Sequence, residues 1–245
     1  MIKNVLRALP ALALPVLPLA APAPAAAAPA EATSAQQHRA VVVSAAAART
    51  APPSAEGVPL FEALSWIPEA EEGTRDGYSR DQFKHWNRGE NPTDGCDTRK
   101  EVILSEALEA PEVGPKCALS GGRWFSEYDQ KWVTSAKELD VDHMVPLAEA
   151  WDSGAAAWTA ARTEAYANDQ GAPNSLIAVS GSSNRSKADK DPADWLPVPA
   201  DRCKYTVDWV ADKLRWRLSA DVAEVQALDR LAEQCPTATV TYQQA

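Results

Sequence analysis

The spacing of hydrophobic positions in the second half of the chain predicts a mixture of strands and helices. A short apolar run with β-branched residues at 176–179 is typical of a buried strand. The segment 117–134, which contains glycines and several aromatic residues, predicts a β-hairpin leading into a strand that ends near His143. Apolar residues at helical spacing predict two C-terminal helices, at 201–218 and 221–235. Together these elements predict an α+β fold.

Shorter helices are predicted before and between these elements. Apolar residues at helical spacing mark 61–67 and 80–86, and the second of these helices contains His85. As a lone histidine beside two aromatic residues, His85 is interpreted as a packing or surface residue rather than a ligand. Pro146 ends the preceding strand and can open a helix, and 155–166 is a further helical stretch.

The N-terminal part of the chain differs in composition from the rest. Residues 1–30 carry two basic residues, an apolar run broken by prolines, and alanines that offer cleavage sites, which is typical of a secretory signal peptide. A membrane anchor is the alternative, but the run is shorter than the roughly 20 residues that a spanning helix needs. Residues 31–57 lack aromatic side chains and are predicted to be a disordered linker or pro-segment. Residues 58–245 are expected to form one domain of a secreted, extracellular protein.

Four cysteines in an exported chain indicate two disulfides. Three pairings are possible in principle. The sequential one, Cys96 with Cys117 and Cys203 with Cys235, would close two local loops. Zinc binding is the competing interpretation, but the chain has no C-x-x-C spacing.

The candidate chemistry is concentrated around Asp142 and His143. A histidine with an adjacent carboxylate can combine a proton acceptor with a hard cation in one small volume, as metal-assisted hydrolysis requires. Such a pair alone more often marks a turn or an exposed strand end. The second segment changes this interpretation, because Asn184 follows the strand at 176–179 in a polar turn that enters a short helix. A ββα unit of this order can fold Asn184 back beside Asp142.

Asp142-His143, Asn174 and Asn184 resemble the His-Asn-His/Asn signature of HNH nucleases, the ββα-metal superfamily. The sequences DVDHMVP and NRSK are similar to the HNH domain of RNA-guided CRISPR nucleases. The longer pattern resembles secreted bacterial HNH-family proteins related to the C-terminal domain of GmrSD-type restriction enzymes, over about 78–235. The resemblance implies a ββα-metal core with added helices and two disulfides. It also implies an endonuclease that hydrolyses DNA, with RNA as an alternative substrate.

The resemblance implies a role for each residue of the signature. His143 is the general base that takes a proton from water, and Asn174 orients the loop near it. Asp142 and the amide oxygen of Asn184 are the metal ligands, and such hard oxygens suit a single Mg²⁺, or Mn²⁺, better than zinc. The zinc-using bacteriocin nucleases of the superfamily have a histidine where Asn184 stands. Asp140 is a reserve candidate, as a supporting residue or an alternative ligand.

Because the chain is acidic overall, its contacts to a nucleic-acid substrate are expected to come from a local group of basic residues. The chain has 24 basic and 34 acidic residues, whereas nucleic-acid binding normally rests on Lys and Arg that neutralise phosphates. Arg185, Lys187 and Lys190 lie beside the expected site and are candidates for substrate binding. Arg99 could bind a phosphate or pair with an Asp of the fold. No groove-reading helix is evident, so binding to nucleic acid, above all DNA, is expected to be weak, salt-dependent and of low sequence specificity.

Two other functions remain open. A non-catalytic binding module on a degenerate nuclease fold would explain the acidic composition, although no signature position is visibly lost. Another secreted phosphoesterase could use Asp142 and His143. A serine triad has weak support, because no G-x-S-x-G motif occurs. No protein partner is evident, and no membrane contact is expected after signal cleavage.

Overall fold

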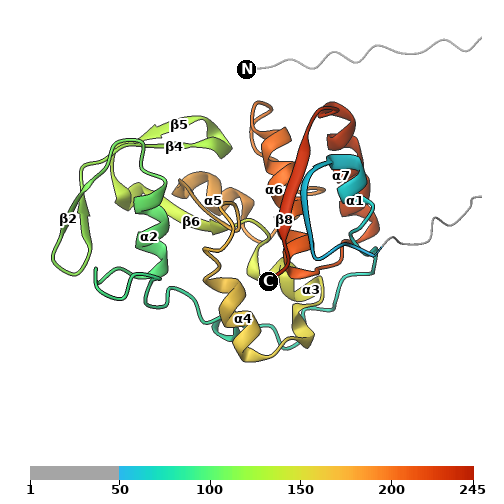
Figure 1. Ribbon diagram of the computed structural model, residues 1–245, viewed down its shortest axis with the longest axis horizontal. Helices are drawn as coiled ribbons and strands as arrows, with labels where there is room; N and C mark the ends of the chain where they lie inside the picture. Colours follow the sequence, from blue (N-terminus) through green and yellow to red (C-terminus); the bar gives the residue numbers. More distant parts are fainter. Residues whose placement is uncertain (1–49) are drawn as a thin grey trace, which may run out of the picture. The chain divides into compact units, whose positions relative to one another are not determined.

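The computed structural model describes residues 50–245 (Figure 1). The predicted signal peptide, and the predicted linker up to residue 49, lie outside the described residues. Within 50–245, no helix is both long and apolar enough to cross a membrane. Helices are mixed with small antiparallel sheets, which confirms the predicted α+β class.

Most elements are short, apart from two longer helices near the C-terminus. The helices are α1 (Leu60–Leu64), α2 (Thr98–Ser105), α3 (Leu147–Asp152), α4 (Ala160–Ala167), α5 (Gly181–Lys187), α6 (Arg202–Trp216) and α7 (Val222–Gln234). The strands are β1 (Ser54–Pro59), β2 (Glu112–Gly114), β3 (Ala118–Ser120), β4 (Trp124–Ser126), β5 (Lys131–Val133), β6 (Leu139–His143), β7 (Leu176–Ser180) and β8 (Thr239–Gln243). The helix predicted at 80–86 is reduced to a 3₁₀ turn at Arg80–Gln82.

Strands β6 and β7 form the antiparallel pair around which the predicted site is built. His143, the last residue of β6, pairs with Leu176, the first residue of β7. Helix α5 follows β7 directly, and the side chain of Ser180 caps it by accepting a hydrogen bond from the Ser183 backbone N–H. The strand predicted at 176–179 is confirmed; α3 and α4 lie between β6 and β7 in the chain, and β6, β7 and α5 come together through strand pairing (β6 and α5 are labelled in Figure 1).

The two faces of the β6–β7 pair pack into different hydrophobic cores. Side chains alternate along a strand, so Leu176 and Ala178 face one core while Ile177 and Val179 face the other. The first core also contains buried residues of α2, β4, β5 and β6: Val102, Ile103, Trp124, Val133, Leu139 and Val141. The second, larger core is shared with α1, α6 and α7. Burial on both faces explains the continuous apolar run of β7.

The predicted hairpin at 117–134 is confirmed in its second half. Strands β4 and β5 pair antiparallel, with Phe125 opposite Trp132. The backbone N–H of Ser180 donates to the side-chain oxygen of Ser126 at 2.9 Å, which links the hairpin to the end of β7. The turn between β4 and β5 carries Tyr128, which is buried. The hairpin therefore places the hydroxyl of Tyr128 close to Asp142 of β6.

The predicted C-terminal helices are confirmed as α6 and α7, but the chain ends differ from expectation. Strand β8 follows α7 and pairs antiparallel with β1 at the opposite end of the domain sequence. Residues 54–57, predicted to belong to a disordered linker, are therefore part of the domain. These residues are ordered because β1 pairs with a strand far away in the sequence, with Ala55 opposite Tyr242. A local sequence pattern does not predict such a long-range contact.

A buried lysine ties α6 to α3 and α7. The Lys213 side chain is 0% exposed, and its ammonium lies 2.8 Å from carboxylate oxygens of both Glu149 and Glu224. It also donates to Ser153 Oγ at 2.8 Å and to the Ser219 backbone oxygen at 2.7 Å. Because each charge has partners, the network satisfies the requirement that buried ions be paired and hydrogen-bonded.

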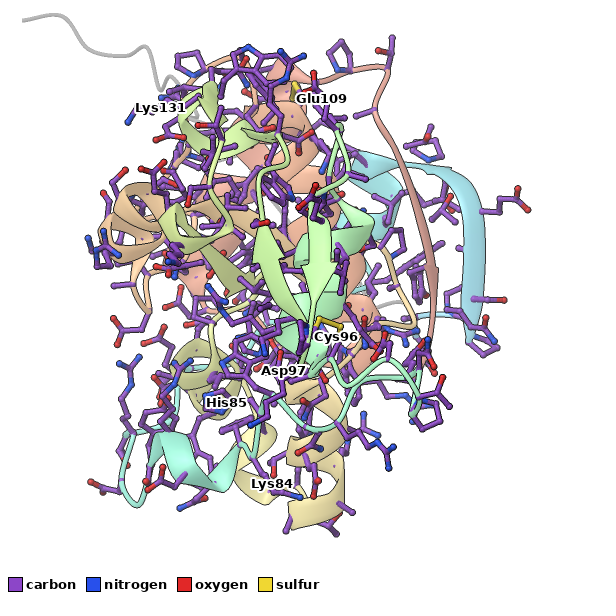
Figure 2. All side chains as sticks on the ribbon, turned by 90° about the vertical axis from the view of Figure 1, so that its left-hand side faces the viewer. Lys84, His85, Cys96, Asp97, Glu109 and Lys131 are labelled. Carbon is purple, nitrogen blue, oxygen red and sulfur yellow. A yellow bond between two sulfur atoms is a disulfide. The ribbon has the colours of Figure 1, made fainter. Side chains whose placement is uncertain are left out.

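The two disulfides have the sequential pairing that was one of three possibilities. Cys96 is bonded to Cys117, and Cys203 to Cys235. Figure 2 shows Cys96 and its disulfide beside Asp97, at the start of α2. The second disulfide joins the first turn of α6 to the residue that follows α7.

Removing the second disulfide should destabilise the domain. The double substitution Cys203→Ser/Cys235→Ser frees a loop with a sequence separation of 32 residues. The expected loss in the free energy of unfolding is about 2–4 kcal/mol, because the cross-link restricts the unfolded chain. Urea unfolding followed by tryptophan fluorescence measures it, with wild type treated with a reductant as the control. An unchanged urea midpoint would contradict this expectation.

Candidate active site

Four of the residues singled out in the sequence line one cavity of about 400 Å³ beside the ββα unit. Asp142 and His143 enter it from the end of β6, and Asn184 and Arg185 from α5. Pro146, Leu147 and Ala148, at the start of α3, form another wall. Tyr78 and Arg80 complete it from the segment before α2. The structure thus gathers the acid, the imidazole and the carboxamide around a single space.

Asp142 is held by two buried donors. Its Oδ2 atom accepts a hydrogen bond from the Tyr128 hydroxyl at 2.8 Å and another from the Lys187 ammonium at 2.6 Å. Burial raises the pKa of Asp142, while the ammonium of Lys187 and the hydroxyl of Tyr128 oppose that rise. Among the described residues, no donor binds Oδ1. One oxygen of this carboxylate is therefore fixed by the protein, and the other remains available.

Lys187 connects the end of α5 to the end of β6. Besides Asp142, its ammonium donates to the backbone oxygens of His143 and Met144, each at 2.9 Å. All three of its donors are used, and its side chain is 0% exposed. The phosphate contact predicted for Lys187 is incompatible with this burial. The side chain positions Asp142 and the backbone after it.

His143 has a fixed tautomer. Its Nε2 atom lies 3.0 Å from the backbone oxygen of Ala167, and its ring stacks on Trp86 and Tyr166 with centroids 5.5 and 6.2 Å away. Burial lowers the pKa of His143 to about 3, so the ring is neutral near pH 7. A carbonyl can only accept, so Nε2 carries the proton. The lone pair that can take up a proton is therefore on Nδ1.

Asn184 is oriented by Asp140, the reserve candidate predicted from the sequence. Its amide nitrogen donates to Asp140 Oδ2 at 3.3 Å, and the same oxygen lies 3.3 Å from Arg185 Nη1. Asp140 and Asp142 point from the same face of β6, because the side-chain period of a strand is two. With its nitrogen turned to Asp140, the amide of Asn184 has its oxygen free for another partner. Arg185 remains largely solvent-exposed, at 72% of its side chain.

Besides Lys187, two further predicted site residues, Asn174 and Arg99, do not line the cavity. Asn174 precedes β7, and its amide nitrogen donates to Asp208 Oδ1 of α6 at 2.5 Å. The hydrogen bond that holds the chain near His143 comes instead from Ser175, the residue after Asn174. The backbone oxygen of Ser175 accepts from the Met144 N–H at 3.0 Å. Arg99 donates to the backbone oxygen of Leu139 at 2.6 Å and so braces β6. Among the described residues Arg99 has no Asp partner, and it does not line the cavity.

Several neighbours of the site carry no motif that would have identified them. Tyr128 belongs to a hairpin recognised only for its aromatic content, and Tyr166 to a stretch interpreted as scaffold. Arg80 lines the cavity and its charge contributes to lowering the pKa of His143. His85 is half-buried with its ring centroid 6.4 Å from that of His143, and its Nδ1 lies 2.6 Å from the Phe83 backbone oxygen. It does not line the cavity, and its ring contacts those of Trp86 and His143.

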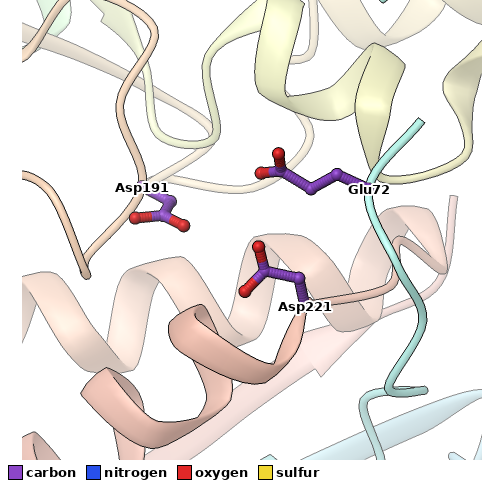
Figure 3. Close-up of side chains that lie close together, drawn as sticks. All are labelled: Glu72, Asp191 and Asp221. Atoms are coloured by element: carbon purple, nitrogen blue, oxygen red, sulfur yellow. The ribbon is translucent and has the colours of Figure 1, made fainter. Parts of the chain in front are cut away.

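A separate acidic cluster does not line the cavity. Carboxylate oxygens of Glu72, Asp191 and Asp221 lie within 4.8 Å of one another (Figure 3). Asp221 caps α7 by accepting from the Glu224 N–H, and Asp191 accepts from backbone N–H groups of the turn after it. Desolvation and then the charges of nearby carboxylates raise the pKa of Glu72 to about 7. Protonation of Glu72 near neutrality relieves the repulsion within the cluster.

The burial of the Asp142–Lys187 pair predicts strong coupling between the two side chains. Lys187→Met should lower the free energy of unfolding by about 3–5 kcal/mol, because it leaves a buried carboxylate without its partner. Asp142→Asn leaves the ammonium unpaired in the same way. The double variant should lose much less than the sum of the two losses. Urea unfolding of all four proteins gives the coupling energy, and additive losses would show that the pair is not the constraint inferred here.

The buried ring of His143 predicts an unusual titration. Between about pH 8 and 5 its nitrogen chemical shifts should remain those of a neutral Nε2–H imidazole, because burial lowers its pKa to about 3. The unfolded ring binds its proton near 6.5, so stability should fall as the pH drops from about 6.5 towards 3. Two-dimensional ¹⁵N NMR tests this, with His143→Ala identifying the signals. A midpoint near 6.5 in the folded protein would refute it.

Comparisons with known proteins are consistent with this arrangement. The family model of GmrSD restriction endonucleases, C-terminal domain, matches residues 80–231, which include every residue of the cavity except Tyr78. An uncharacterized secreted protein of Arthroderma benhamiae is 38% identical over 173 residues, covering 70% of this chain and 82% of that protein. The bacterial source implied by the sequence resemblance is not shown by this relative. No solved structure matches the chain significantly.

Proposed function

Because the chain belongs to the family of GmrSD restriction endonuclease C-terminal domains, we propose that it is a secreted, metal-dependent endonuclease that hydrolyses phosphodiester bonds of DNA. The observation that supports this most directly is the cavity that contains Asp142, a neutral His143 and Asn184. The nuclease-like character follows from the family. The substrate, the metal and the roles of the residues below are our proposal.

His143 is the proposed general base. Its Nε2–H is occupied by the Ala167 carbonyl, so Nδ1 takes the proton from a water molecule that attacks phosphorus in line. Stacking on Trp86 and Tyr166 holds the ring plane while the proton moves. The resemblance to HNH nucleases implies products with a 5′-phosphate and a 3′-hydroxyl.

The proposed metal ligands are Asp142 Oδ1 and the amide oxygen of Asn184. The structure supports this donor set in two respects: Oδ2 of Asp142 is already bound by Tyr128 and Lys187, and the nitrogen of Asn184 is turned to Asp140. A carboxylate and an amide oxygen suit Mg²⁺ or Mn²⁺. Such a cation, when bound, would stabilise negative charge on the phosphate and on the departing oxygen. Asp140 then acts as a positioning residue for Asn184.

Arg185 and Arg80 are the proposed contacts to substrate phosphate within the cavity. Both line it from opposite segments, one on α5 and one before α2. Arg185 is already next to Asp140, an exposed ion pair whose strength in water is small. A phosphate can therefore replace that contact at little cost. The guanidinium fork matches the geometry of two phosphate oxygens.

Export of the protein is supported by two independent features. The relative from Arthroderma benhamiae is named as a secreted protein. The four cysteines form two disulfides, which persist in oxidising surroundings outside the cytosol. We therefore propose that the mature domain acts outside the cell.

Cleavage assays test the proposed function. Purified protein is incubated with plasmid DNA or with RNA in Mg²⁺, Mn²⁺, Zn²⁺ or EDTA. Cleavage in Mg²⁺ or Mn²⁺ and none in EDTA is expected. His143→Ala should lower the cleavage rate roughly 10²- to 10⁴-fold, the usual contribution of a general base, with thermal unfolding showing that the fold is kept.

His85→Ala is the matched control for the loss of the base. It removes the other described histidine, whose ring lies 6.4 Å from that of His143 without lining the cavity. This variant should keep most of the activity. Full cleavage by His143→Ala would remove the assigned base, and the absence of cleavage with every metal and both substrates would favour a binding module.

A further inference from the structure

We propose that a hollow beside the cavity, here called the hairpin groove, binds a single-stranded stretch of nucleic acid. The groove has a volume of about 460 Å³, and the residues that matter here are Lys131, Trp132, Lys137, Asp140, Ser182 and Arg185. They come from β5, from the turn before β6, from β6 itself and from α5. The inference rests on the proposed nuclease function and adds the class of substrate strand.

The hairpin groove adjoins the active-site cavity at Arg185. Arg185 lines both hollows, and Asp140 at the edge of the groove binds the amide of Asn184 in the cavity. Ser182, in the first turn of α5, lies on the groove side of the same helix. On this proposal, a strand lying in the groove would pass Arg185 on its way to the cavity that His143 lines.

Trp132 gives the groove an exposed aromatic surface. The residue is 55% exposed, although tryptophan is usually well buried. Its ring is held by two neighbouring side chains, with the Phe125 ring centroid 5.1 Å away and the Arg123 guanidinium 4.3 Å from its centre. An indole held in place and open to solvent can stack with a nucleobase without first losing conformational freedom. Arg123 can add a cationic plane to the same stack.

The groove gathers positive charge on an acidic protein. Lys131, Lys137 and Arg185 line it from separate elements together with the carboxylates of Glu138 and Asp140, so basic residues outnumber acidic ones here, whereas the chain as a whole has a formal net charge of −10. Lys137 forms no ion pair within residues 50–245. Lys131 pairs with Asp129 at 2.8 Å, but 61% of the lysine side chain is exposed. Such exposed pairs contribute little, so these cations are available to phosphates.

The combination of stacking surface and cations favours a single strand over a duplex. In a duplex the base faces are stacked on one another and cannot reach Trp132, so only its phosphates would contribute. A single strand offers both its phosphates and its base faces, and stacking on an aromatic side chain strengthens binding with little dependence on sequence. The helix at the groove, α5, has only seven residues, which is short for reading a major groove.

Binding to an inactive protein tests the groove separately from catalysis. Fluorescein-labelled oligo(dT), oligo(rU) and a DNA duplex of equal length are titrated, in EDTA, with His143→Ala as the background protein, and anisotropy is measured. Single strands should bind more tightly than the duplex. Adding Trp132→Ala should weaken single-strand binding roughly 5- to 100-fold, the range for one stacked base, while Trp132→Phe should restore part of it.

Salt dependence tests the charged side chains. Adding Lys137→Ala should lower the slope of log affinity against log salt for a single strand by about 0.7, the value for one phosphate contact. Phe61→Ala and Arg230→Ala are the matched controls, since these exposed residues belong to α1 and α7 rather than to the groove. Both should bind like the background protein.

The outcomes separate the groove from the nuclease. Unchanged single-strand affinity in Trp132→Ala, or duplex binding that is equal to or tighter than single-strand binding, overturns the groove proposal even if the wild type cleaves plasmid. Groove-dependent binding by a wild type that cleaves nothing would sustain the groove and remove the catalytic role. A preference between oligo(dT) and oligo(rU) identifies the sugar of the strand.

Discussion

The contact on which the site depends is the buried ion pair between Asp142 and Lys187. Lys187 is the last residue of α5, and its ammonium also binds the two backbone oxygens that follow Asp142 in the chain. A charge so far from water must be paired and hydrogen-bonded, so α5 cannot move from β6 without exposing an uncompensated ion. The position of Asn184, one turn earlier on α5, follows from the same constraint. A core interaction thereby sets the geometry of the cavity.

The same pair shapes the chemistry that the cavity can perform. The ammonium of Lys187 offsets the charge of Asp142, and the amide of Asn184 is neutral. The electrostatic attraction of a cation is therefore weaker here than at a site of unpaired carboxylates. Mg²⁺ sites in proteins commonly use one or two carboxylates together with substrate phosphates. On the proposed function, cation and substrate would then bind interdependently. His143 fits this arrangement, because burial keeps its ring neutral and the Ala167 carbonyl fixes which nitrogen can accept a proton.

The sequence was informative where structure is local and periodic. The apolar run of β7, the proline before α3 and the spacing of α6 and α7 each report a nearby environment, and these elements form as predicted. Properties set by distant partners were not accessible. From the sequence, Lys187 is interpreted as a surface cation, but in the structure Tyr128 and Asp142 enclose it. Asn174 is interpreted as a site residue, but its amide nitrogen donates to Asp208 of α6. Asp142, His143 and Asn184 line one cavity because β6 pairs with β7 and α5 follows β7 directly, whereas Lys131 and Lys137 of the groove carried no motif.

An acidic chain with a small cationic groove would discriminate among substrates by how closely they can approach. At distances beyond a Debye length, about 8 Å at physiological salt, the net charge of −10 is largely screened. Closer in, an acidic protein repels phosphates on average, and the basic residues Lys131, Lys137 and Arg185 of the groove oppose that repulsion locally. A thin, flexible strand can place its phosphates there while keeping the rest of its backbone away, whereas a stiff duplex must bring charge over a wider surface. On the groove proposal, the acidic composition, at first an objection to nucleic-acid binding, would favour strands that fit the groove.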